Sequence, residues 1–355
     1  MRTQGEAGQI DALTGIRALA SCWVIACHLQ PAVAVLLPAI AHSVALVADG
    51  GIYGVDLFFI LSGFVLALNY HDRFGVITGP AYVRFLWLRL ARVYPVHILV
   101  LFVFLLFHWA SLLIGRPEPA ENLFTLGTFV GNIFLVHWWR FPGHFSWNYP
   151  SWSISMEWLA YVCFPLVIHR VRRLRGTAAT VCLAFGLLAA TAYLSWRFER
   201  PAHLIRLGGE FVAGCLLHSV YRRLRQTGTW RGDRVTIPAV LAGITVANCF
   251  AWYSLPVFGL AVLALALDRG AASRFFGSAP MVYGGRISYS VYMVHAAAIS
   301  ACHVALPLAK YTGAALPVRV GVLAVYVAAI GISGAVVHHR FEEPARERMR
   351  QIRFF

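Results

Sequence analysis

The hydrophobic positions of this chain gather into long runs that are separated by short polar stretches rich in arginine. A helix needs about 20 apolar residues to cross the hydrocarbon core of a bilayer, and several runs reach or approach this length. The pattern therefore predicts membrane-spanning helices, the shorter of which need snorkelling side chains at their ends. The predicted spans are 13–37, 54–70, 86–113, 151–169, 178–196, 205–220, 236–252, 255–267, 287–308 and 317–338.

A further apolar segment, 121–138, decides the topology. If it crossed the membrane, the arginine-rich segment 169–175 would face outside when the N-terminus is inside. If it is instead a re-entrant or interfacial helix, ten spans remain and both termini lie in the cytoplasm. Most of the 30 basic residues then lie on the cytoplasmic side, as the positive-inside rule expects. The outer side then keeps Arg116, Arg140, Arg197, Arg200, Arg206, Lys310 and Arg319.

Composition supports the membrane class. Hydrophobic residues make up 59% of the 355 positions and charged residues 13%, and the mean hydropathy is +0.67. These values exclude an ordinary soluble globular protein and predict an all-α, polytopic membrane helical bundle, with about ten transmembrane helices and no appended soluble domain. The net charge of +15 comes in short arginine clusters between apolar runs, which favours anionic lipid headgroups over nucleic acid as the partner.

The seven cysteines lie within apolar stretches and never form a Cys-x-x-Cys pair. They are therefore interpreted as small core residues. No grouping of His, Cys and Asp has the spacing typical of zinc, so no metal is expected.

Arg17 and His28 lie inside the first span, eleven positions apart. Eleven residues are close to three helical turns, so both side chains lie on one face, about 16 Å apart along the axis. Charged and titratable groups are costly in a membrane, and the pair therefore suggests function. The alternative is structural: an arginine on lipid phosphate and a histidine satisfied by a carbonyl.

Two carboxylates are predicted at the same depth as His28, in the outer half of the membrane. Asp56 opens the second span and Glu157 lies in the first turns of the span that begins near Ser151. A carboxylate beside an imidazole raises its pKa and fixes its tautomer, so this set predicts a general base, His28, oriented by Asp56 or Glu157. The alternative is that both acids stabilise helix N-termini.

The inner half carries arginines instead. Arg84, Arg89 and Arg92 precede or open the third span, and Arg17 lies at the same level. Arg89 and Arg92 are three apart and share a helix face. Guanidinium groups bind phosphate in a bidentate way, so this face predicts a polyanionic cytoplasmic ligand such as a nucleotide diphosphate. Positive-inside anchoring explains any one of these arginines, but explains less well a set that reaches into apolar segments.

Six short elements, in order, resemble the signature of the integral-membrane acyltransferase 3 family over roughly residues 10–346. They are the Arg17 to His28 spacing, Gly54-Val-Asp56-Leu-Phe-Phe-Ile-Leu-Ser62-Gly63-Phe64, Arg89-x-x-Arg92-x-x-Pro95, Trp152-Ser153-Ile-Ser155-Met-Glu157, Gly285-Arg-Ile-Ser288-Tyr289-Ser-Val-Tyr292-Met-Val-His295, and Phe341-Glu342-Glu343-Pro344.

The resemblance implies an O-acyltransferase of the bacterial cytoplasmic membrane that passes an acyl group, usually acetyl, from acyl-CoA to a hydroxyl. The acceptor is expected to be a cell-surface glycan or lipid-linked saccharide, with a secondary metabolite such as a macrolide as the alternative. Together with the residue pattern, it predicts that His28, Asp56 and Glu157 are catalytic and that Arg17, Arg89 and Arg92 bind acetyl-CoA. One membrane domain is expected over 1–355, with a core at 10–346 and a cytoplasmic tail at 339–355.

Several hydroxyls and one histidine are candidates for a supporting role. Serine and tyrosine hydroxyls are possible oxyanion donors, and the alternative for each is interhelical packing. The histidine is a candidate for a proton relay or a second base, and equally for a structural role. The candidates are Ser62, Ser153, Ser155, Tyr289, Tyr292 and His295. A sugar exporter or a non-catalytic scaffold for polysaccharide assembly would also place charges in a helical bundle, and these classes stay open.

Overall fold

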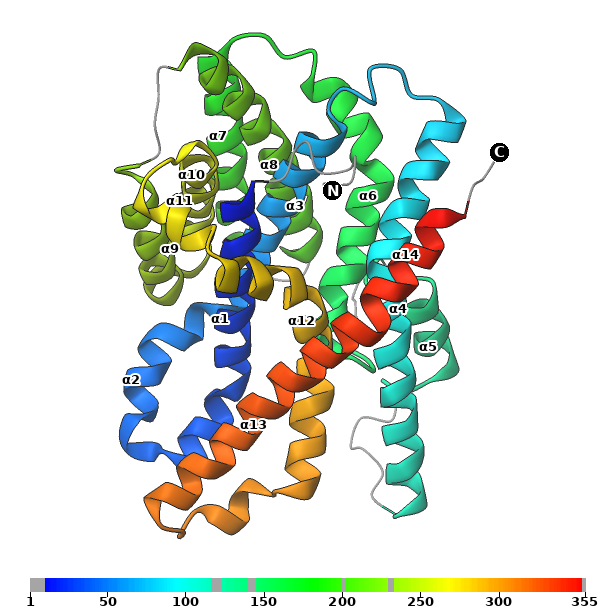
Figure 1. The fold of residues 1–355 in the computed structure, drawn as a ribbon, viewed down its shortest axis with the longest axis vertical. Helices are drawn as coiled ribbons and strands as arrows, with labels where there is room; N and C mark the ends of the chain where they lie inside the picture. The colour runs from blue at the N-terminus through cyan, green and yellow to red at the C-terminus, as the bar shows by residue number, and fades with distance from the viewer. Residues whose placement is uncertain (1–9, 116–122, 140–144, 199–201, 229–232, 353–355) are drawn as a thin grey trace. The chain divides into compact units, whose positions relative to one another are not determined.

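The computed structural model of this protein describes residues 10–115, 123–139, 145–198, 202–228 and 233–352 (Figure 1). These residues form helices and turns, with no strand among them. The α-helices are α1 (Asp11–Leu36), α2 (Pro38–Ala48), α3 (Gly54–Tyr70), α4 (Gly79–Leu113), α5 (Leu126–Ile133), α6 (Trp152–Val171), α7 (Thr177–Arg197), α8 (Ala202–Thr227), α9 (Thr236–Phe250), α10 (Ser254–Leu267), α11 (Ala271–Phe276), α12 (Ala279–Ala305), α13 (Leu316–Val337) and α14 (Glu343–Gln351).

Short turns of 3₁₀-helix lie between several of these helices, and one turn of π-helix lies between α13 and α14. The 3₁₀ turns are η1 (Asp49–Tyr53), η2 (Tyr149–Ser151), η3 (Ala251–Tyr253) and η4 (Leu308–Tyr311), and the π turn is η5 (His338–Glu342).

The predicted all-α membrane bundle is confirmed, and each of the ten predicted spans falls on an α-helix. Within the described residues, eight stretches are long and apolar enough to cross a membrane. The number is lower than ten for two reasons. α9 and α10, of 15 and 14 residues, lie within one such stretch, 236–267, and the more polar α8 is not among the eight.

The predicted re-entrant or interfacial segment, 121–138, contains only the eight-residue helix α5, and its first two residues lie outside the described part. Eight residues of α-helix extend about 12 Å, far less than the hydrocarbon core of about 30 Å. A complete crossing by α5 is therefore excluded. Three of the basic residues predicted on the outer side, Arg116, Arg140 and Arg200, also lie outside the described residues.

The chain divides into two compact units, each built from segments that are distant in sequence. Unit 1 comprises Met1–His28, Val44–Thr78 and Cys163–Ser288, and unit 2 comprises Leu29–Ser43, Gly79–Val162 and Tyr289–Phe355. The boundaries fall inside α1, α2, α6 and α12, so these helices contribute to both units. The single membrane domain over 1–355 stays a prediction.

In unit 1, α3 packs tightly on α8 through glycines on both helices. A Cβ atom at Gly63 would lie 2.0 Å from the carbonyl oxygen of Phe211, and one at Gly214 would lie 2.1 Å from that of Ile60. Both distances are far below van der Waals contact. Small residues let helices approach to backbone contact in a membrane, where dispersion between close surfaces replaces the hydrophobic effect as the driving force.

Gly63→Ala is therefore expected to destabilise the protein by about 1–3 kcal/mol or more, because the obstructing atom is backbone and cannot rotate away. Thermal unfolding in detergent measures the effect. Gly186→Ala, in α7, is the matched control, because a Cβ atom there meets no atom within 4 Å. Equal melting temperatures for the two variants would contradict the close approach.

In unit 2, α14 packs on α4, and side chains of α4 bind its C-terminal end. Arg84 donates to the carbonyls of Arg350 and Ile352, and the indole of Trp87 donates to the carbonyl of Met349. Arg84 thereby satisfies two carbonyls at the end of the helix, where intrahelical donors run out, and Trp87 adds a second donor to the Met349 carbonyl, which also accepts from the amide of Ile352. The predicted tail at 339–355 is thus helical through Gln351 and held on α4, while 353–355 lie outside the described residues.

Candidate functional site

His28 and Arg17 lie on α1, in the part that belongs to unit 1. Nδ1 of His28 lies 2.8 Å from the carbonyl oxygen of Val24, one turn earlier on the same helix. A carbonyl accepts only, so Nδ1 carries the proton and a neutral ring keeps a lone pair on Nε2. The guanidinium of Arg17 lies 5.9 Å from the centre of the Phe58 ring, within cation–π range.

Asp56, in the first turn of α3, is fully buried and is bound by an arginine that the sequence analysis left without a role. Arg206 of α8 donates from Nε to Oδ1 over 2.7 Å and from Nη2 to Oδ2 over 2.6 Å. Two parallel bonds of this kind fix the carboxylate in orientation as well as charge. Asp56 therefore has a cationic partner on α8, and its predicted role in orienting His28 stays a prediction.

Glu210 extends this buried ion pair. It lies one turn after Arg206 on α8, is fully buried, and is close enough to interact electrostatically with both Arg206 and Asp56. The guanidinium of Arg206 also stacks over the ring of Trp252, 4.7 Å from its centre. Arg206 was predicted on the outer side of the membrane, without a role. The sequence signal that could have identified it is the four-residue spacing between Arg206 and Glu210, a cation and an acid within one apolar span.

Glu157 lies on α6, in the part that belongs to unit 2. The hydroxyl of Tyr161, one turn later, donates to its Oε1 over 2.5 Å. This hydrogen bond holds the Glu157 carboxylate against α6 itself. The predicted catalytic role of Glu157 stays a prediction.

Arg89 and Arg92 lie on α4, also in unit 2, and both stack on aromatic rings. The guanidinium of Arg89 lies 5.9 Å from the centre of the Phe85 ring, and that of Arg92 lies 5.5 Å from the centre of the Tyr289 ring. The Tyr289 hydroxyl donates to the carbonyl of Val93, which ties the C-terminal part of α12 to α4 beside Arg92. Arg92 is thereby held between an aromatic face and the carboxylate described next.

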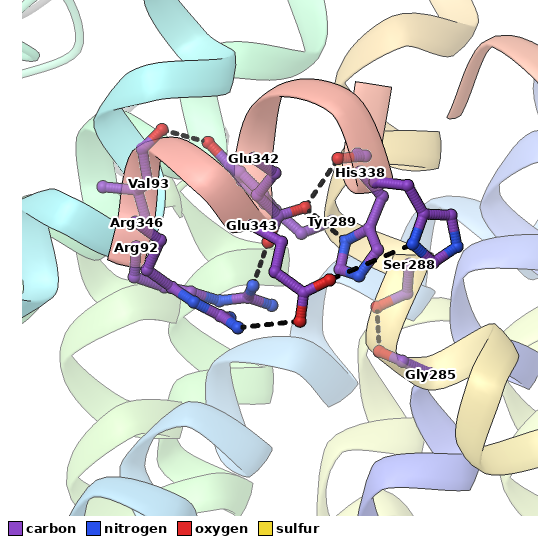
Figure 2. A network of polar contacts seen from close by, with 11 residues as sticks. Arg92, Val93, Gly285, Ser288, Tyr289, His338, Glu342, Glu343 and Arg346 are labelled. Carbon is purple, nitrogen blue, oxygen red and sulfur yellow. Dashed lines mark hydrogen bonds and ion pairs between the residues drawn. The ribbon is translucent and has the colours of Figure 1, made fainter. Parts of the chain in front are cut away.

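Glu342, in the π turn η5, joins three other side chains of unit 2 (Figure 2). Its Oε1 forms an ion pair with Arg92, and its Oε2 accepts from Ser290 over 2.6 Å and lies 2.9 Å from Nδ1 of His338. The carboxylate is fully buried. π turns interrupt regular helices and are frequent at functional sites, and this one directs Glu342 toward Arg92.

Glu342 had no role predicted from the sequence, although the Phe341-Glu342-Glu343-Pro344 element contains it. An acid at the end of the last apolar span, followed by proline, was the available signal. Its partner on α4 is 250 positions away in the chain, so the pairing itself was not predictable.

The candidate hydroxyls of unit 2 are all engaged in the structure. Ser155 donates to the carbonyl of Leu135 over 2.7 Å, and Tyr289 donates to that of Val93. Ser153 and Tyr292 lie 2.9 Å apart and share the carbonyl of Pro150. Each hydroxyl has one proton, so a bond to an oxyanion requires one of these bonds to break. The oxyanion role stays a prediction, as does that of Ser62 on α3.

His295 is fully buried on α12, and its Nδ1 lies 2.5 Å from the carbonyl oxygen of Tyr292. Its ring meets the ring of Tyr149 edge to face, 6.0 Å between centres. Nδ1 therefore carries the proton in the neutral ring. Its predicted role as relay or second base stays a prediction.

One group of side chains in the described residues has possible metal-ligand atoms within 4.8 Å of one another: His338, His339 and Glu343. Nδ1 of His338 is already bonded to Glu342, and Glu343 lies 3.9 Å from the guanidinium of Arg346. A cation there would be repelled by Arg346, and the group is assigned no metal.

Comparison with known proteins identifies the family of the chain. The model of the acyltransferase 3 family, described as an acyltransferase domain, matches residues 10–338. "Acyltransferase MdmB" of Streptomyces mycarofaciens is 27% identical over 319 residues, covering 81% of this chain and 78% of that protein. "Protein 2 in picA locus" of Rhizobium radiobacter is 33% identical over 163 residues, covering 39% of this chain and 73% of that protein.

No solved structure matches the chain. The family match extends from the beginning of α1 to the first residue of the π turn, and so includes five of the six elements noted in the sequence. The chain therefore belongs to the acyltransferase 3 family and is a multi-helix membrane acyltransferase.

Proposed function

We propose that this protein is an O-acyltransferase of the bacterial cytoplasmic membrane that transfers an acyl group, acetyl in the simplest case, from cytoplasmic acyl-CoA to a hydroxyl of a cell-surface glycan or lipid-linked saccharide. Family membership supports acyl transfer. The observation that carries the choice of a hydroxyl acceptor is His28, whose Nδ1 is bonded to the carbonyl of Val24, so that Nε2 is the basic nitrogen of the neutral ring.

In the proposed reaction, Nε2 of His28 removes the proton of the acceptor hydroxyl while its oxygen attacks the thioester carbonyl. The new ester bond forms, the carbon–sulfur bond breaks, and the proton passes from the imidazolium to the departing thiolate as free coenzyme A. A positioned base makes an alcohol, which is a weak nucleophile at neutral pH, competent for this attack.

Arg89 and Arg92 are proposed to bind the phosphates of acyl-CoA, with Arg17 as a further candidate. Guanidinium groups match phosphate geometry, and stacking on Phe85 and Tyr289 pre-orients the guanidinium groups of Arg89 and Arg92. Glu342 neutralises part of the charge of Arg92 and holds its position, so it acts as a positioning residue in this proposal. Both termini are proposed to lie in the cytoplasm, on the same side as these arginines.

The double variant Arg89→Ala, Arg92→Ala is expected to lose at least tenfold in affinity for coenzyme A, because two charge-assisted phosphate contacts disappear. Isothermal titration of the detergent-purified protein with acetyl-CoA measures this. The matched control, Arg348→Ala with Arg350→Ala, removes two exposed arginines of α14 and should bind as the unmodified protein does.

Arg92→Ala also leaves buried Glu342 without its guanidinium, so Arg89→Ala is measured alone as well. It removes one phosphate contact without breaking the Glu342 ion pair. Unchanged affinity in both the single and the double variant would contradict the binding role.

The enzyme class and the acceptor are tested separately. Purified protein that releases free thiol from acetyl-CoA only when an acceptor is present is a transferase, whereas an exporter or a scaffold consumes no acetyl-CoA. Surface glycans from cells with and without the gene are then compared for O-acetyl groups. Loss of the O-acetyl signal supports the glycan acceptor, and unchanged glycans favour a secondary metabolite such as a macrolide.

A further inference from the structure

Unit 1 contains a cluster of buried nitrogen atoms that have no hydrogen-bond partner among the described residues. They are Nδ1 of His71, Nδ1 of His218 and Nη1 of Arg172. His71 caps the C-terminus of α3, His218 lies on α8 with 1% of its surface exposed, and Arg172 directly follows α6. Buried polar groups are normally bonded, so a group of such atoms at one place indicates a missing partner.

These side chains lie close together. The rings of His71 and His218 are 5.5 Å apart between centres. The guanidinium of Arg172 lies against the turn after α3, where a Cβ atom at Gly75 would be 2.7 Å from its Nη1. Glycine at this position therefore leaves the space that the guanidinium occupies.

The cluster is positively charged. Arg222 is paired with Asp72 over 3.1 Å, and Asp72 is the one acid among the neighbours that act on His71. Arg223 is committed to the carbonyls of Leu174 and Gly176. Burial lowers the pKa of His71 to about 4, helped by Arg222 and Arg172, so its ring is neutral at pH 7. The surplus positive charge comes from arginine.

We infer that Arg172, His71 and His218 bind an anionic phosphate group, supplied either by a lipid headgroup or by a free phosphate or soluble phosphate ester. The guanidinium provides charge and a directed N–H, and each neutral imidazole donates from Nδ1 in the matching tautomer. Arginine excludes a metal cation from the same place by repulsion. This end of α3, α6 and α8 lies on the predicted cytoplasmic side, where anionic lipids and soluble phosphates are both available. The site is independent of the proposed transfer reaction.

Thermal unfolding of the full-length protein in a neutral detergent tests the site, because a ligand that binds only the folded state raises the melting temperature. Sodium phosphate is titrated against sodium chloride at equal ionic strength. In a second arm, native mass spectrometry compares retention of phosphatidylglycerol with retention of phosphatidylcholine. Stabilisation by phosphate alone indicates that the ligand is a soluble phosphate, and preference for phosphatidylglycerol alone indicates that it is a lipid headgroup. Either result supports the site.

Arg172→Gln is expected to lower phosphate or phosphatidylglycerol affinity at least tenfold, because a charge-assisted bond is lost. Arg175→Gln is the control, since it removes the same charge from an exposed residue three positions away. His71→Phe keeps the ring volume without Nδ1 and provides a second test if the first variant folds poorly. The inference is overturned if neither phosphate nor phosphatidylglycerol binds preferentially, or if Arg172→Gln and His71→Phe bind as well as Arg175→Gln.

Discussion

Replacing His28 with alanine is expected to lower acyl transfer by about 10²- to 10⁴-fold, the usual contribution of a positioned general base. The physical reason is the tautomer: Nδ1 is bonded to the carbonyl of Val24, so Nε2 is the nitrogen able to take the hydroxyl proton. The side chain is only partly buried, and its removal should leave folding and membrane insertion intact. Release of free thiol from acetyl-CoA by membranes that contain each variant measures the rate.

His28→Gln separates proton acceptance from hydrogen bonding. The amide of glutamine is able to donate to the Val24 carbonyl but is not basic enough to accept a proton, so this variant is expected to be as slow as the alanine variant. Cys22→Ala, at an exposed position on the same helix, is the control and should react at the unmodified rate. Full transfer by either His28 variant would remove His28 from the mechanism.

Arg206→Met is expected to destabilise the protein by about 3–5 kcal/mol, the usual cost of leaving a buried charge without its partner. Asp56 would lose both hydrogen bonds from the guanidinium, and Glu210 would lose its electrostatic interaction with Arg206. Thermal and chemical unfolding in detergent, followed by circular dichroism, measures the loss. A variant as stable as the unmodified protein would contradict the structural role of the pair.

The double variant Asp56→Asn, Arg206→Met provides the internal control. It removes both charges, and replacing a whole buried ion pair costs much less than breaking it. We therefore expect the double variant to be more stable than Arg206→Met alone, with a coupling energy that reports the ion pair. Additive effects of the two substitutions would mean that the pair contributes no coupling in the membrane-like environment.

The sequence predicted the helices well because the bilayer leaves few alternatives. Backbone groups in lipid must be bonded within their own segment, so a long apolar run becomes a helix whatever its neighbours are. The span predicted at 54–70 is α3 without any shift, and 178–196 lies within α7. The prediction was less accurate at α4, which begins at Gly79 instead of residue 86, because Gly79, Pro80 and Arg84 interrupt the apolar signal at its beginning.

The partners of the polar side chains were not predictable in the same way. The role of Asp56 in orienting His28 stays a prediction, but its ion pair with Arg206, 150 positions away, was not predicted from the sequence. Glu342 had no predicted role, and in the structure it is the partner of Arg92, 250 positions away. Such pairs depend on which helix faces meet, and one sequence gives no measure of that.

The order of apolar and polar residues is enough to define the class of this protein: a helical membrane bundle with arginines and carboxylates inside its apolar segments. This followed from the free energy of transferring backbone and side chains into lipid, which acts on each segment separately. The packing of the helices determines which buried charges neutralise one another, as in Asp56 with Arg206 and Glu342 with Arg92. A buried charge is stable only beside its partner, and contact between distant segments is set by how the helices pack.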